Sequence, residues 1–222
     1  MAVTKRFYIQ NSAAPNNQHC NMKILIGAPI HEIKNYSIKR WLSSVQNIRC
    51  EQNVSYHLLM VDNSQNPEWY KKVHEYCKEL NFTNYTLIHL SNMKDGESWE
   101  AERLGFSREL LRETVIKESY DYLWSWECDI LCPPETLTYL LKFTPEFNAI
   151  YHTYPPRGNT IDNGEQDGIG CVLYDKQIFY SFKFVENQTP LGADGRLLFE
   201  VLRRGWKTIE IHNVFTLQHI GS

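Results

Sequence analysis

Apolar runs alternate with amphipathic segments as far as residue 145. The runs at residues 23–29, 56–64, 85–90 and 120–126 are short and apolar, which is typical of buried strands. Between them, apolar side chains recur at helical spacing; the segments concerned are residues 33–48, 68–80 and 97–118. A further helix is expected after Pro133-Pro134, since proline suits a first helical turn. This alternation predicts an α/β fold with three layers, in which helices cover both faces of a mainly parallel central sheet.

The remaining third of the chain continues the pattern less regularly. Residues 149–154 and 169–174 resemble strands, and the polar stretch between them is long enough to be a functional or mobile loop. Residues 192–207 contain a helix that Gly205 should end, and residues 208–214 form a last strand. We therefore expect one domain over residues 23–222, preceded at residues 1–22 by a polar leader or a short extra element.

Composition excludes several classes of protein. The 222 residues suit one α/β domain, and a net charge of −3 provides no basic field for non-specific binding of nucleic acid. No apolar run approaches the roughly 20 residues of a membrane span, and the N-terminus lacks the apolar core of a secretory signal. Six cysteines without a C-x-x-C pair indicate a reduced, cytoplasmic chain without a zinc cluster.

Carboxylates stand where predicted strands end. Asp62 closes one buried run, and Glu127 and Asp129 follow another, in the stretch LWSWECDILCPPETL. Ligands of open α/β sheets bind at the carboxyl ends of the strands. Acidic groups that meet there repel one another unless a cation lies between them, and oxygen ligands suit Mg²⁺ or Mn²⁺. Such an ion would also neutralise a diphosphate, so the pattern predicts a metal-assisted nucleotide site.

The order of these elements resembles the GT-A fold of nucleotide-sugar glycosyltransferases, especially the family-2-like enzymes. The first strand and its turn, KILIGAP, match the start of that fold, and VDNS matches its second strand end. AERLG stands where the family has an A-R-N-x-G-like helix segment, and ECD stands at its D-x-D-type metal motif. GADGRLLFEVLRRGWKTIEI stands where the family has an E-D segment followed by a helix and a strand, and LQHIG fits a C-terminal metal-binding histidine.

The resemblance implies a role for each matched residue. A metal ion, Mn²⁺ or Mg²⁺, would be held by Asp129 with Glu127 and His219. The nucleotide would contact Pro29, Asp62, Arg103 and Glu127, and Asp194 would be the catalytic base. The implied reaction is transfer of a sugar from a nucleoside-diphosphate sugar, UDP-linked by family habit, to an acceptor hydroxyl. Inversion follows if Asp194 is the base, and retention stays open otherwise. Two departures from the family are Glu127 at the first metal position and an A-D in place of the E-D pair.

Each of these residues also has an ordinary structural explanation. Asp62 could be a turn residue, Asp194 could cap a helix over residues 195–204, and Glu127 and Asp129 could cap the helix that begins at Pro134. Arg103 could be a solvated charge on a helix, and His219 could be a surface histidine. Trp99 could be a core residue or, with Gly168 and Gly170, part of the acceptor site. The acceptor itself is open between a glycan, a small molecule, a protein and a modified nucleic-acid base.

Other functions compete with the transferase. A sugar-phosphate nucleotidyltransferase needs a glycine-rich basic loop after the first strand, and GAPIHEIKN has a single glycine. The dinucleotide fingerprint and the P-loop are both absent from the sequence. The remaining alternative is a catalytically degenerate GT-A domain that binds a nucleotide or a partner without turnover.

Overall fold

The computed structural model describes residues 7–11, 22–90, 99–153, 170–185, 192–212, 214 and 217–220. Its elements are, in chain order, β1 (Phe7–Asn11), β2 (Met22–Ile30), the 3-10 turn η1 (Glu32–Lys34), α1 (Ile38–Gln46), β3 (Val54–Asp62), α2 (Pro67–Glu79), β4 (Tyr85–Leu90), α3 (Trp99–Lys117), β5 (Tyr122–Trp126), β6 (Ile130–Leu131), α4 (Thr136–Leu141), β7 (Ala149–His152), β8 (Cys171–Asp175), α5 (Gln177–Tyr180), α6 (Gly192–Arg203), β9 (Thr208–Ile211) and β10 (Gln218–His219).

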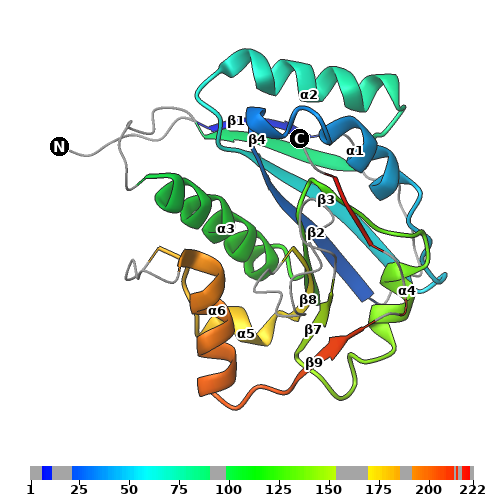
Figure 1. Cartoon of the computed structure of the whole chain (residues 1–222), viewed down its shortest axis with the longest axis vertical. Coiled ribbons are helices and arrows are strands. Elements are labelled where there is room, and N and C mark those ends of the chain that lie inside the picture. The colour runs from blue at the N-terminus through cyan, green and yellow to red at the C-terminus, as the bar shows by residue number, and fades with distance from the viewer. Residues whose placement is uncertain are drawn as a thin grey trace.

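The central sheet has the strand order β1-β4-β3-β2-β5-β8-β7-β9 (Figure 1). Strands β4, β3, β2 and β5 pair in parallel, and β7 pairs in parallel with β9. Only β1 and β8 run against the others among these eight, because their pairings with β4, β5 and β7 are antiparallel. The mainly parallel sheet predicted from the alternating pattern is therefore confirmed.

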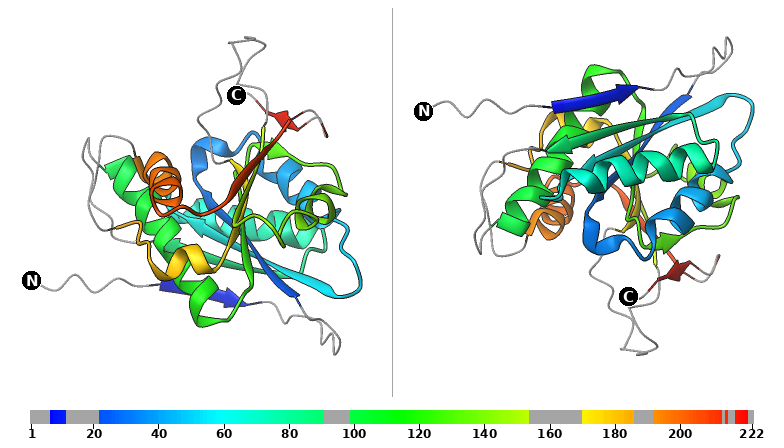
Figure 2. Two further views of the ribbon diagram at one scale, coloured as in Figure 1. Left: turned by 90° about the horizontal axis from the view of Figure 1, so that it is seen from below. Right: turned by 90° about the horizontal axis from the view of Figure 1, so that it is seen from above.

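Each face of the sheet carries its own apolar core. Ile24 and Ile26 of β2 pack with α1, α2 and α4, whereas Leu25 points to the other face, toward α3, α5 and α6. Figure 1 and Figure 2 show α1 and α2 on one side of the sheet and α3 and α6, side by side, on the other. Alternate residues of a strand point to opposite faces, so a strand buried on both sides must be apolar throughout. This arrangement is the expected three-layer α/β/α architecture.

Close packing between β2 and α3 depends on Gly27. A Cβ atom at this position would lie 2.7 Å from Leu123 and 3.0 Å from Leu111, so only glycine lets the α3 side chains approach so closely. At the other end of the molecule, Gly205 has a φ of +70° and follows α6, and the Trp206 amide donates to the Val201 carbonyl over 3.1 Å. The prediction that Gly205 ends this helix is confirmed.

Some boundaries differ from the sequence-based expectation. Residues 33–48 do not form one helix: η1 comes first, where the His31 ring accepts a hydrogen bond from the Ile33 amide, and α1 begins at Ile38. Helix α6 begins at Gly192, so Asp194 lies inside the first turn and does not precede the helix as a cap. Residues 7–11 form β1, an edge strand antiparallel to β4, so this part of residues 1–22 is an extra element of the sheet (Figure 2).

Among the described residues, no helix is both long enough and apolar enough to cross a membrane.

Candidate functional site

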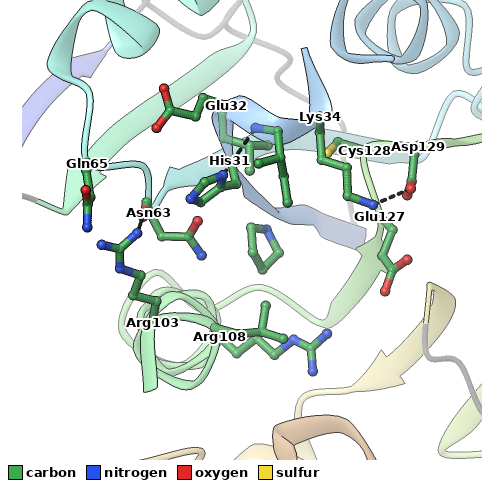
Figure 3. Close-up of a pocket in the computed structure, with 14 residues that line it drawn as sticks. His31, Glu32, Lys34, Asn63, Gln65, Arg103, Arg108, Glu127, Cys128 and Asp129 are labelled. Carbon is green, nitrogen blue, oxygen red and sulfur yellow. Dashed lines mark hydrogen bonds and ion pairs between the residues drawn. The ribbon is translucent and has the colours of Figure 1, made fainter. Parts of the chain in front are cut away.

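A pocket of about 510 Å³ opens at the carboxyl edge of the parallel strands. The chain reaches it after β2, after β3 and after β5, and α3 closes its side (Figure 3). Its lining carries both signs of charge and comprises Pro29, Ile30, His31, Glu32, Ile33, Lys34, Asn63, Gln65, Arg103, Leu104, Arg108, Glu127, Cys128 and Asp129. The parallel strands bring segments nearly 100 residues apart to one rim, as the sequence pattern predicted.

Asp129 is the most enclosed acidic group of the pocket, with its side chain fully buried. Its Oδ2 atom forms an ion pair with the Lys34 ammonium and accepts a hydrogen bond of 3.2 Å from the Tyr36 hydroxyl. The same oxygen lies 3.4 Å from Nε2 of His219. Three donors from two distant segments thus converge on one carboxylate oxygen.

Short strand pairing holds His219 at this place. Strand β10 runs antiparallel to β6 with His219 opposite Ile130, and the Ile220 amide donates to the Asp129 carbonyl over 2.8 Å. The Trp126 indole fixes the start of β6 by donating to the Ile130 carbonyl over 2.7 Å. His219 is consequently a partly buried residue, with 9% of its side chain exposed, and not a surface histidine.

The turn after β2 positions Lys34. The Glu32 amide donates to the Ser64 hydroxyl over 2.8 Å, and the Asn63 amide donates to the Ile30 carbonyl over 3.0 Å. These bonds fasten η1 to the turn after β3, so the Lys34 backbone is fixed at the rim. Figure 3 shows its side chain directed toward Asp129 along this rim.

Arg103 and Asn63 form the opposite wall. Arg103 donates to the Asn63 carbonyl over 2.9 Å, and the Asn63 side-chain amide donates to the Ser107 hydroxyl over 3.2 Å. Asn63 is only 8% exposed, and its Oδ1 atom accepts no hydrogen bond from any described residue. A buried acceptor in a pocket wall suits an N–H or O–H group of a ligand.

Asp62 lies behind this wall. Its carboxylate is fully buried, accepts the Ser64 amide over 2.9 Å and accepts Nδ1–H of His89 over 2.7 Å. The His89 contact follows from the sheet register, which pairs Asp62 with His89. Both carboxylate oxygens are therefore used within the protein, and the pocket lining at this strand end is Asn63 and Gln65 instead.

Cys128 sits between the two acidic residues as a neutral thiol. Burial, together with the neighbouring Asp129 carboxylate, raises its pKa to about 12. A thiol with such a pKa is a poor nucleophile and a poor metal ligand near neutral pH.

The acidic residues do not form a complete metal cage. Among the described residues, no group of three or more His, Cys, Asp and Glu side chains is arranged to hold a metal ion. Glu127 lines the pocket, but no hydrogen bond or ion pair joins its side chain to Asp129 (Figure 3). Asp129 and His219 are nevertheless ligand types that Mn²⁺ accepts, and ions of this kind commonly take their remaining ligands from substrate phosphates and water. Asp129 and His219 would therefore provide two of the ligands of a divalent ion.

The remaining residues named from the sequence fall in different places. Pro29 and Arg103 line the pocket as expected, and the Gly170 carbonyl accepts the Glu127 amide over 2.8 Å. Trp99 and Asp194 lie in the first turns of α3 and α6, but their side chains are outside the described part of the structure. Gly168 lies outside the described residues altogether.

Sequence reasoning missed the pocket residues Lys34, Asn63 and Arg108, and it missed Tyr36, whose hydroxyl donates to Asp129. Lys34 and Tyr36 follow the first parallel strand, and Lys34 is a charged side chain at a strand end. A search of every strand-end turn for charged side chains would have found Lys34. Nothing local marks Tyr36, because its contact with Asp129 joins residues 93 positions apart.

No protein-family model matches the sequence, and no curated protein is similar to it in sequence. Solved structures are similar in fold. The mannosyltransferase PcManGT of Pyrobaculum calidifontis, in complex with GDP-Man and Mn²⁺, matches 90% of this chain with a TM-score of 0.60 and 13% identity. TarS 1–349 of S. aureus with UDP-GlcNAc matches 89% (TM-score 0.61, 12% identity). Glucosyl-3-phosphoglycerate synthase of Mycobacterium tuberculosis, with Mn²⁺, UDP and glucosyl-3-phosphoglycerate, matches 91% (TM-score 0.58, 12% identity).

The matched regions span 57%, 60% and 73% of those three proteins, so the first two are substantially longer than this chain. Identities of 12–13% carry information about the fold alone. The strand order, the two helical layers and these likenesses agree, and the chain has the GT-A fold of nucleotide-sugar glycosyltransferases, as the sequence predicted.

Proposed function

We propose that the protein is a glycosyltransferase that moves a sugar from a nucleoside-diphosphate sugar to an acceptor hydroxyl. The observation that carries this proposal is the meeting of Asp129, His219 and Lys34 at the carboxyl-edge pocket of a GT-A fold. In open α/β sheets this edge is where ligands bind. A pocket of about 510 Å³ falls in the size range of small-molecule sites.

The pocket offers suitable partners for both ends of such a donor. Lys34, His31 and Arg108 supply positive or hydrogen-bonding groups for a diphosphate, and Asn63 supplies a buried acceptor for a base or ribose. The structural neighbours include complexes with GDP-Man, UDP and UDP-GlcNAc. We favour a uridine nucleotide, as the family resemblance suggests, and leave the transferred sugar open.

A divalent ion, Mn²⁺ or Mg²⁺, would be held by Asp129 and His219, with Glu127 near enough in the pocket lining to orient water or the donor. When bound, the ion neutralises the charge that develops on the departing diphosphate. The buried Asp129 carboxylate and its Tyr36 partner keep the ligand oxygen in a fixed position, which limits reorganisation during the reaction.

In the chemical step, the acceptor oxygen forms a bond to the anomeric carbon while the bond from that carbon to the diphosphate oxygen breaks. The bonding pair leaves with the nucleoside diphosphate, and Asp194 takes the proton of the acceptor hydroxyl. Attack opposite the leaving group inverts the anomeric centre. The acceptor, with Trp99, Gly168 and Gly170 as candidate contacts, remains one of a glycan, a small molecule, a protein or a modified nucleic-acid base.

Slow hydrolysis of the donor tests this function without knowledge of the acceptor. UDP-sugars and GDP-mannose are incubated with the protein and Mn²⁺, and the released nucleoside diphosphate is measured. Asp129→Asn should abolish release, whereas Glu135→Gln, a surface carboxylate that pairs with Arg49, should leave it unchanged. Asp194→Asn should abolish transfer and hydrolysis if Asp194 is the base. Metal-dependent nucleotide binding with no release for any donor would instead support the degenerate binding module.

A further inference from the structure

Lys34 places a cation where a metal-dependent transferase would hold its ion. Its ammonium contacts Oδ2 of Asp129, the same oxygen that lies 3.4 Å from Nε2 of His219. A divalent ion that bound Oδ2 of Asp129 and Nε2 of His219 would therefore need the space that the ammonium occupies. The protein's own cation and a metal ion compete for one carboxylate oxygen.

Charge makes this competition unequal. The carboxylate is fully buried and already neutralised by Lys34, with only 19% of the lysine side chain exposed. Addition of a divalent ion alone would leave a large excess of positive charge in an enclosed site, where like charges repel more strongly than in water. Addition of the ion together with a diphosphate brings opposite charges in nearly equal amounts, so the balance of the site is kept.

Lys34 is also placed to follow the diphosphate. Its backbone is fastened in η1 through the Glu32–Ser64 hydrogen bond, and Lys34 is one of the residues that line the pocket. A flexible four-carbon stem allows the ammonium to leave Asp129 and stay within the same pocket, where it forms a point-charge contact with phosphate oxygens. Lys34 would thus neutralise the Asp129 carboxylate in the donor-free protein and part of the diphosphate charge once the donor is bound.

We propose that Lys34 makes metal binding depend on the donor. Its ammonium pairs with Asp129 in the donor-free protein, and it moves to pair with the diphosphate when donor and metal bind together. This inference rests on the proposed function, since it assumes that a nucleoside diphosphate enters the pocket. It assigns Lys34 a positioning role at Asp129 and a binding role at the donor. The expected behaviour is strongly coupled binding of metal and nucleotide, with weak binding of the metal alone.

Binding of Mn²⁺ to the full chain, measured by the loss of the free-ion paramagnetic resonance signal, tests the proposal without any turnover. The wild type is titrated with Mn²⁺ alone, with Mn²⁺ and UDP, and with Mn²⁺ and GDP. We expect a nucleotide to tighten Mn²⁺ binding by at least about tenfold, an effect of ordinary allosteric size. Lys34→Gln should bind Mn²⁺ alone at least about tenfold more tightly than the wild type does, and should bind the nucleotide more weakly.

Matched variants separate charge from shape and folding. Lys34→Arg keeps a cation and should exclude Mn²⁺ as the wild type does, and Asp129→Asn should bind no Mn²⁺ under any condition. Circular dichroism checks that each variant is folded. If Lys34→Gln does not fold, tight Mn²⁺ binding by the wild type without nucleotide would still overturn the proposal.

The outcomes distinguish this inference from the proposed function. Tight Mn²⁺ binding by the wild type without nucleotide, at the level of Lys34→Gln, would overturn the role of Lys34 and leave the transferase intact. Failure of the wild type to bind UDP or GDP with or without Mn²⁺ would overturn both.

Discussion

Replacement of Asp62 by alanine tests whether this strand-end carboxylate serves the fold or the nucleotide. The substitution removes two buried contacts at once, the 2.9 Å bond from the Ser64 amide and the 2.7 Å bond from His89. Each donor left unsatisfied in the interior costs about 1–3 kcal/mol, so the free energy of unfolding should fall by about 2–6 kcal/mol. That is a large part of the 5–15 kcal/mol, roughly, that stabilises an ordinary domain.

Urea denaturation followed by tryptophan fluorescence measures the loss directly. Asp62→Asn is the matched variant: it keeps an acceptor for the Ser64 amide and should lose less stability than Asp62→Ala. Asn63→Ala changes the adjacent residue, which lines the pocket, and should weaken UDP binding with a smaller loss of stability.

The reasoning fails if Asp62→Ala unfolds at nearly the wild-type urea concentration and yet loses its affinity for UDP. That result would mean that the Asp62 carboxylate turns from His89 to the nucleotide, as the family resemblance implied.

Three further substitutions test other parts of the fold. Gly27→Ala places a methyl group 2.7 Å from Leu123 of β5 and 3.0 Å from Leu111 of α3, where the side chains are already closely packed. It should lower the free energy of unfolding, measured in urea, by about 1–3 kcal/mol, and a neutral result would contradict that packing. Gly205→Ala meets no steric clash but must adopt a positive φ, so it should cost about 1–2 kcal/mol in the same assay, and a gain in stability would refute the left-handed conformation. Burial lowers the pKa of His152 below 6.5, so on acidification the unfolded chain binds a proton at this residue before the folded protein does. The free energy of unfolding should therefore fall as the pH drops through and below 6.5, and His152→Gln should reduce this fall. An unchanged pH profile of stability in His152→Gln would contradict the prediction.

The sheet could be predicted because its strands are buried on both faces. Residues 85–90 form β4 as expected, and 23–29 and 56–64 fall within one or two residues of β2 and β3. An uninterrupted apolar run leaves few alternatives, and Gly205 marks a helix end by itself. Strand β1 was not resolved from the sequence, since its short run FYIQN lies in a polar segment and gains its order from pairing with β4.

The site could be predicted only as a location. Parallel strand ends meet at one edge, so Pro29, Glu127 and Asp129 reach one pocket whatever the details of the loops. The direction of each side chain depends on pairings that no local pattern encodes. Asp62 turns toward His89 because of the β3–β4 register, and Lys34 meets Asp129 across 95 positions because η1 is fastened to Ser64.

A crystal structure of the protein with Mn²⁺ and UDP, or with GDP if that nucleotide binds more tightly, tests the central proposal most directly. We expect the diphosphate in the pocket between Lys34 and Asp129, the metal ion between Asp129 and His219, and the base against Asn63. Nucleotide bound elsewhere on the surface, with the Lys34–Asp129 ion pair intact, would contradict the proposed site and the function built on it.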